Sequence, residues 1–117
     1  MNKGKYFRFG KYDAWIGYEG GNRGVIRLEW LASGLRSYEI LLDLKALSQE
    51  NSMSSVGFKF KCRNGSLCIK LKSKSDREIV LRITRSWCIF PMFLAEGTME
   101  IHQADIFIKT ISSLYRV

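Results

Sequence analysis

The stretch FKFKCRNGSLCIKLK, which runs from Phe58 to Lys72, decides the fold. Apolar and basic residues alternate on both sides of the dipeptide Asn64-Gly65. This dipeptide between alternating runs is the strongest short-range signal for a β-hairpin, because a type I′ turn needs positive φ at both central residues. We therefore expect two antiparallel strands joined by a loop of Asn64 and Gly65.

The expected register gives this hairpin two unlike faces, because directly opposed residues share a face. In this register Lys59 faces Lys70, a like-charge pair that costs roughly 0.2–1 kcal/mol. The apolar face is expected to carry Phe58, Phe60, Cys62, Leu67, Ile69 and Leu71. The basic face is expected to carry Lys59, Lys61, Arg63, Lys70 and Lys72, with Arg82 extending it onto the next strand. Such a face is either a solvated sheet surface, in which lysines discourage aggregation, or a binding surface for an anionic partner.

The positive charge is a local feature of the chain. The 117 residues carry a net charge of +8 and are 46% hydrophobic, a composition typical of one globular domain over residues 1–117. Nine basic and two acidic residues lie between Val56 and Cys88, a net charge of +7, whereas the remainder carries +1. A concentration of charge of this kind indicates a particular surface.

The residue types needed for catalysis or metal binding do not cluster in the sequence. The three cysteines lack metal-ligand spacing, and the single histidine, His102, stands beside an expected helix start. We therefore expect no catalytic, cofactor or metal site, and a binding protein in preference to an enzyme. The sequence contains no run of about 18 apolar residues and no signal-peptide core, so we expect a cytoplasmic protein that does not bind membranes.

The pattern along the chain predicts an α+β fold. We expect strands over residues 6–9, 12–18, 25–31, 58–63, 66–72, 78–87 and 93–101, a helix over 35–50 and a last helix from 102. The segment 35–50 lacks Gly and Pro, which favours a helix, although Tyr38, Ile40, Leu42 and Leu44 also alternate as in a strand. The expected fold is a mostly antiparallel sheet of about seven strands with two helices on one face.

This layout resembles a family of binding proteins. The resemblance covers residues 12–115 and rests on Asp13, Trp15 and Ile16, on the helix with Leu35, Tyr38 and Leu42, on the four-strand meander, and on the closing segment ADIFIKTISSL. In these features the chain is similar to the small immunity proteins of bacterial polymorphic and contact-dependent-inhibition toxins, including those of WapA-type toxins. The resemblance implies a protein without catalysis that binds one cognate toxin and blocks its active site. The charge of +8 then implies an acidic surface on that toxin.

A second function class fits the basic face. Cations on an open antiparallel sheet suit single-stranded nucleic acid when aromatic rings lie among them, because rings stack on bases. The order of strands and helices is similar to that of the Whirly and PUR single-strand-binding folds. A stacking platform would require Phe7, Phe9, Tyr12, Tyr18 or Trp15 to reach the basic face, because Phe58 and Phe60 are expected on the apolar one.

Overall fold

Nine strands are followed by one helix in the part of the chain that the structure, a computed structural model, describes: residues 3–20, 23–30, 36–44, 52–54, 57–87 and 90–115. The strands are β1 (Lys3–Phe9), β2 (Tyr12–Glu19), β3 (Arg23–Trp30), β4 (Arg36–Leu41), β5 (Ser52–Ser54), β6 (Gly57–Cys62), β7 (Gly65–Ser73), β8 (Glu78–Trp87) and β9 (Phe90–Glu100), and the helix is α1 (Ile101–Leu114). They form two antiparallel sheets, β1-β2-β3-β4 and β5-β6-β7-β8-β9, called here the N-terminal and the C-terminal sheet. The expected single sheet of about seven strands with two helices, in an α+β order, is therefore wrong.

The segment expected to be a helix over 35–50 contains strand β4, and its residues 35 and 45–50 lie outside the described part. Tyr38 and Ile40 point to the same side of the sheet and pair with Leu28 and Ile26 of β3. Burial of this alternating face against a neighbouring strand outweighs the helix propensity of Leu and Glu, which amounts to a few tenths of a kcal/mol per residue.

The central hairpin has the expected faces in a different register. Cys62 pairs with Gly65 and Phe58 pairs with Ile69, so Arg63 and Asn64 form the turn, and Gly65 follows it with φ of 98°. A positive-φ glycine directly after two turn residues is the arrangement of a bulged three-residue hairpin loop. The pairing differs from the expected one by two residues, and a shift of two leaves every side chain on its original face.

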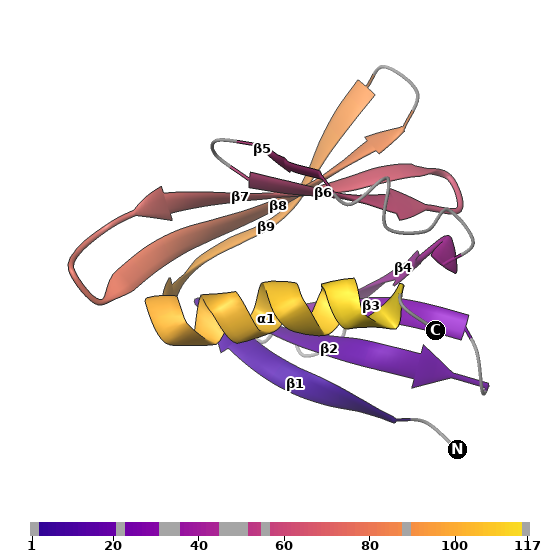
Figure 1. Ribbon diagram of the computed structural model, residues 1–117, viewed down its shortest axis with the longest axis horizontal. Helices are drawn as coiled ribbons and strands as arrows, with labels where there is room; N and C mark the ends of the chain where they lie inside the picture. Colours follow the sequence, from indigo (N-terminus) through magenta and orange to yellow (C-terminus); the bar gives the residue numbers. More distant parts are fainter. Residues whose placement is uncertain are drawn as a thin grey trace.

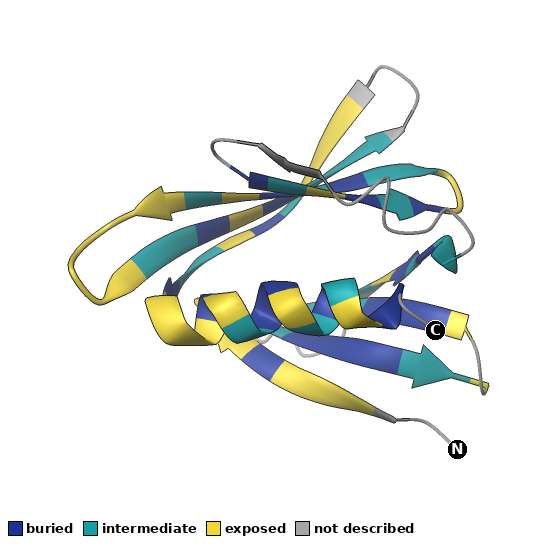
Figure 2. Ribbon diagram, viewed as in Figure 1, coloured by how far each residue is buried: buried dark blue, intermediate teal, exposed yellow. Residues whose placement is uncertain are grey.

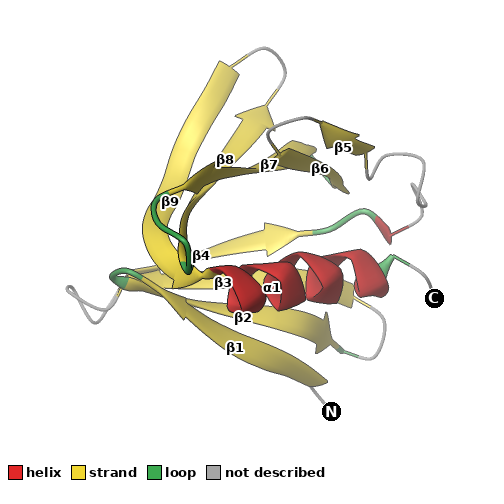
Figure 3. Cartoon of the chain, turned by 60° about the vertical axis from the view of Figure 1, so that its left-hand side comes forward, coloured by secondary structure: helices red, strands yellow, loops and turns green. Residues whose placement is uncertain are grey.

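Helix α1 lies between the two sheets and supplies much of the core (Figures 1 and 3). The Phe107 ring meets Phe7 edge-on at 5.2 Å between centroids, and Tyr115 stacks on Phe60 at 5.9 Å. The Tyr115 hydroxyl donates to the Lys61 carbonyl, and the Tyr18 hydroxyl donates to the Leu114 carbonyl at 2.9 Å. The buried residues of the helix segment are spaced as on one face of a helix, and they are Ala104, Phe107, Ile108, Ile111, Leu114 and Tyr115.

The two sheets approach each other along both edges. On one side Leu42 bridges to Cys62, and the Asp43 N–H donates to the Lys61 carbonyl at 3.1 Å. On the other side Gly97 of β9 lies so close to β1 that an added Cβ would be 2.6 Å from the Phe9 carbonyl carbon. The inner faces thus share one core, and the outer faces of both sheets point away from it (Figure 2).

Candidate binding surface

Five of the six predicted site residues lie on the outer side of the C-terminal sheet, and the sixth, Arg63, is exposed in the hairpin turn. Lys59 and Lys61 come from β6, Arg63 from the turn, Lys70 and Lys72 from β7, and Arg82 from β8. They alternate along their strands with the buried residues Phe60, Cys62, Leu67, Ile69, Leu81 and Ile83. All are exposed except Lys61, which is partly exposed. These six residues are called here the cationic face.

The cationic face has almost no internal compensation of charge. Within the described residues, its only salt bridge joins Arg82 to Glu96, with 4.0 Å between the closest atoms. Lys70 stands directly opposite Arg82 across the β7–β8 ladder, so two cations of the cationic face lie side by side. The expected contact of Lys59 with Lys70 is wrong because of the changed register, and Lys59 instead pairs with Cys68. Repulsion of like charges costs stability, and an anionic partner would remove that cost.

One aromatic ring that sequence reasoning missed lies at the border of this face. Phe93 pairs with Thr84 of β8, its side chain is 51% exposed, and the Arg82 guanidinium lies over its ring at 5.2 Å from the centroid. The rings considered for a stacking platform lie elsewhere: Phe7, Phe9 and Trp15 are buried in the N-terminal sheet, and Tyr12 and Tyr18 pack against the core. Among the described residues the cationic face therefore has one exposed ring.

The outer face of the N-terminal sheet is organised differently. Arg27 makes salt bridges to both Glu19 and Glu39, the latter at 2.8 Å, and its guanidinium lies 5.4 Å from the centroid of the Trp15 ring. Hydrogen bonds with Glu39 and with Glu19 raise the pKa of the Arg27 side chain. Arg8 pairs with Asp13 at 3.0 Å on the same sheet. This set of Arg8, Asp13, Glu19, Arg27 and Glu39 is called here the paired face.

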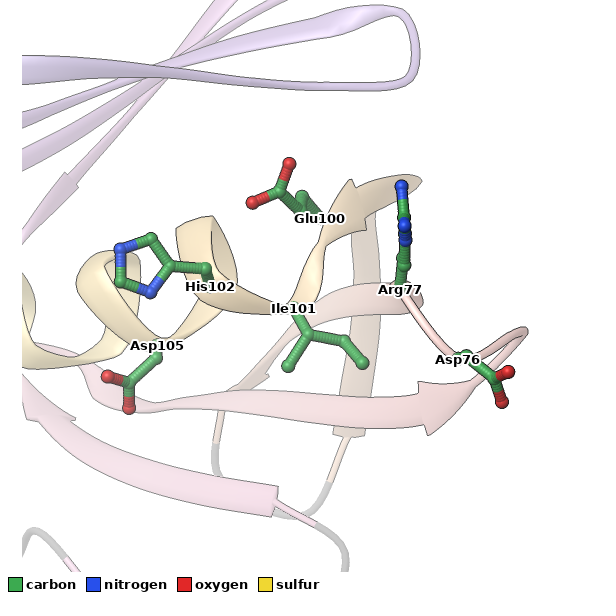
Figure 4. Close-up of a pocket in the computed structure, with 6 residues that line it drawn as sticks. All are labelled: Asp76, Arg77, Glu100, Ile101, His102 and Asp105. Carbon is green, nitrogen blue, oxygen red and sulfur yellow. The ribbon is translucent and has the colours of Figure 1, made fainter.

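A shallow depression at the start of α1 offers no comparable site. It measures about 710 Å³ and is lined by Asp76, Arg77, Glu100, Ile101, His102 and Asp105, all of which are exposed. Figure 4 shows that these side chains point in different directions and do not converge on a common point. Asp105 is engaged by Lys109 at 3.0 Å. His102 is exposed in the first turn of the helix, close to the helix start expected from the sequence.

The described residues contain no group of three or more His, Cys, Asp or Glu side chains arranged to hold a metal ion. In the same part of the chain, no helix has the length and apolar character needed to cross a bilayer. Comparisons with protein-family profiles, with curated proteins and with solved structures find no match for the chain. The candidate site is therefore defined by its own geometry and charge.

Proposed function

We propose that this chain is a non-enzymatic binding protein whose cationic face docks onto an acidic surface of a partner protein, as an immunity protein docks onto its toxin. The supporting observation is the cluster of six cations that form the cationic face, of which only Arg82 forms a salt bridge within the described part of the chain. Complementary charge steers two proteins together and fixes partner choice. The proposal places the protein in the cytoplasm, where such a toxin would act.

The resemblance to immunity proteins is a weaker support than the face itself. Of its elements, the meander and the closing helix are present, whereas the region around Tyr38 forms a strand in place of the helix. Trp15 is buried beneath Arg27 on the paired face, so it belongs to the packing of the N-terminal sheet. The choice of a protein partner rests instead on the composition of the cationic face, which has six cations and one exposed ring.

Growth protection tests this proposal. If a large secreted protein is encoded beside this chain, its C-terminal domain is the toxin candidate. That domain is expressed together with the wild type, with Lys59→Glu/Lys70→Glu or with Lys5→Glu/Lys11→Glu. Both double variants change the net charge equally, but Lys5 and Lys11 are exposed residues of the N-terminal sheet and its first turn. We expect the first variant to lose protection and the second to keep it. Full protection by Lys59→Glu/Lys70→Glu, or no protection by the wild type, would contradict the proposal.

Single-stranded nucleic acid is the second candidate, and Phe93 is the observation that favours it. Its exposed ring beside Arg82 offers one stacking position among the cations. If this candidate is correct, fluorescence anisotropy with a labelled oligothymidylate will detect binding at low salt. The logarithm of the affinity will then fall with the logarithm of salt by about 0.7 per neutralised phosphate, and Phe93→Ala will weaken binding. Absence of binding at low salt would exclude it.

A further inference from the structure

Arg85 is a partly buried cation at the place where the cationic face ends. Its side chain leaves the inner side of β8 and reaches strand β4 of the other sheet, where one terminal nitrogen, Nη1, donates to the Tyr38 hydroxyl at 2.9 Å. The second, Nη2, donates to the Asn64 carbonyl at 3.2 Å. The guanidinium carbon lies 6.0 Å from the centroid of the Tyr38 ring. Arg85 thus connects the two sheets and the turn of the central hairpin.

The hydrogen-bonding capacity of Arg85 is only partly used. A guanidinium has five N–H groups and no acceptor. Two of them donate to Tyr38 and Asn64, both of which are neutral, and the buried Nε has no hydrogen-bond partner. No carboxylate of the described residues forms a salt bridge with Arg85. A partly buried cation without an anion is costly, and a carboxylate is the group that matches its planar fork.

The space beside Arg85 is small and lies where the turn of the central hairpin meets strand β4. A cavity of about 200 Å³ is lined by Tyr38, Asn64, Arg85 and Met92. Asn64 directly follows Arg63 in the turn, and Met92 directly precedes the exposed Phe93. Pockets for drug-sized ligands measure roughly 300–1,000 Å³, so this one is sized for a single side chain. Because Arg85 lies on the inner side of β8 and Phe93 on the outer side of β9, a partner on the cationic face reaches this cavity around the hairpin turn at Arg63 and Asn64.

We propose that this cavity, the Arg85 pocket, receives one Asp or Glu side chain of the partner protein. The proposal deepens the proposed function and rests on it for the identity of the partner. Arg85 supplies the charge and two or more N–H groups, the Tyr38 hydroxyl and the Asn64 carbonyl hold its guanidinium in place, and Met92 covers one side of the carboxylate. Such an enclosed aromatic and arginine pair is typical of the few residues that dominate a protein interface.

Arginine side-chain NMR tests the pocket without the partner. The Nε–Hε resonance of Arg85 is followed while sodium acetate, and separately sodium phosphate, replaces sodium chloride at constant ionic strength. We expect a saturable shift with acetate at Arg85 and at the Tyr38 ring, and no saturable shift at Arg27, which is already paired. Arg85→Gln should abolish the shift at Tyr38. A linear acetate response, or tighter binding of phosphate than of acetate, would overturn the assignment to a protein carboxylate.

Binding of the toxin domain supplies the second readout. Arg85→Lys keeps the charge but loses the planar fork, so we expect the affinity to fall by about 30-fold or more if the carboxylate is buried in the complex. Tyr38→Phe, which removes only the hydroxyl that orients Arg85, should give a smaller loss. Unchanged affinity in Arg85→Lys would show that Arg85 only braces the two sheets. Loss of protection in Lys59→Glu/Lys70→Glu together with a negative acetate titration would leave the proposed function standing and remove the pocket. A saturable acetate shift together with full protection by that double variant would support the pocket and contradict the proposed function.

Discussion

The outer faces of the two sheets carry charge in opposite ways. On the paired face of the N-terminal sheet, one arginine holds two carboxylates and covers a tryptophan ring. On the cationic face of the C-terminal sheet, Lys70 stands opposite Arg82, and the one salt bridge of this face among the described residues joins Arg82 to Glu96. The first arrangement stabilises the fold by itself. The second costs stability in the free protein and gains it only when an anionic partner is present.

The difference between the two outer faces is meaningful only if both sheets close over one core. Gly97→Val tests this closure, and it is expected to reduce stability more than any other variant. A Cβ on Gly97 would lie 2.6 Å from backbone atoms of Phe9, so the strands β9 and β1 must separate. We expect a loss of about 3 kcal/mol in the free energy of unfolding measured with urea.

Gly20→Ala is the matched control for that variant. Gly20 has a positive φ of 64°, which Gly97 does not, but an added Cβ at Gly20 would meet nothing within 4 Å. The cost should be about 1 kcal/mol, which reflects backbone strain alone. Equal losses in the two variants would mean that close approach of the sheets at Gly97 does not stabilise the fold.

The buried thiol of Cys62, on the inner side of the central hairpin, makes the stability of the protein sensitive to alkaline pH. Burial raises the pKa of its thiol from 9.0 to about 11, which Arg85 partly opposes. A pKa that is higher in the folded state favours folding below pH 9, and this contribution is lost as the pH rises toward 11. Between pH 8 and pH 10.5 the free energy of unfolding should fall by about 2 kcal/mol because of this group. Cys62→Ala should lose this part of the pH slope, whereas an unchanged slope would contradict burial of the thiol.

Replacing one cation on each outer face by methionine measures what the charges of that face contribute to stability. Arg27→Met leaves Glu19 and Glu39 without their shared cation, and we expect a loss of about 1 kcal/mol because partly exposed ion pairs are screened by water. Lys70→Met removes the repulsion with Arg82, so stability should stay within about 0.5 kcal/mol of the wild type or rise slightly. Urea unfolding of both variants measures the difference. A larger loss in Lys70→Met than in Arg27→Met would reverse the assignment of the two faces.

The sequence predicted the faces of the central hairpin but not its register. Alternation places Phe60 and Leu67 inward and Lys59 and Lys70 outward in either register, since the two differ by an even number of residues. The exact turn depends on which residues take positive φ, and an Asn-Gly pair is compatible with both loops. Around Tyr38 the local preference for helix lost to pairing with β3, a contact that local periodicity does not contain.

The sequence predicts the cations of the candidate site, but it does not predict the positions of Phe93 and Arg85. Simple alternation from the buried Ala95 would turn Phe93 inward, but an irregularity between Ile83 and Thr84 shifts the pairing and turns its ring toward Arg82. Arg85 is one of the nine basic residues between Val56 and Cys88. What distinguishes it from the other eight is its contact with Tyr38, which brings β8 to β4. Local sequence patterns do not specify a contact between residues 38 and 85.

Lysine-acylation footprinting of the protein, alone and in complex with the toxin domain, tests most directly whether the unpaired cations form the binding surface. Mass spectrometry reads each lysine separately, so the lysines of both sheets are compared within one sample. We predict that Lys59, Lys70 and Lys72 lose most of their reactivity in the complex, while Lys5 and Lys11 react as in the free protein. Protection of Lys5 and Lys11 with unchanged reactivity at Lys59, Lys70 and Lys72 would contradict the account.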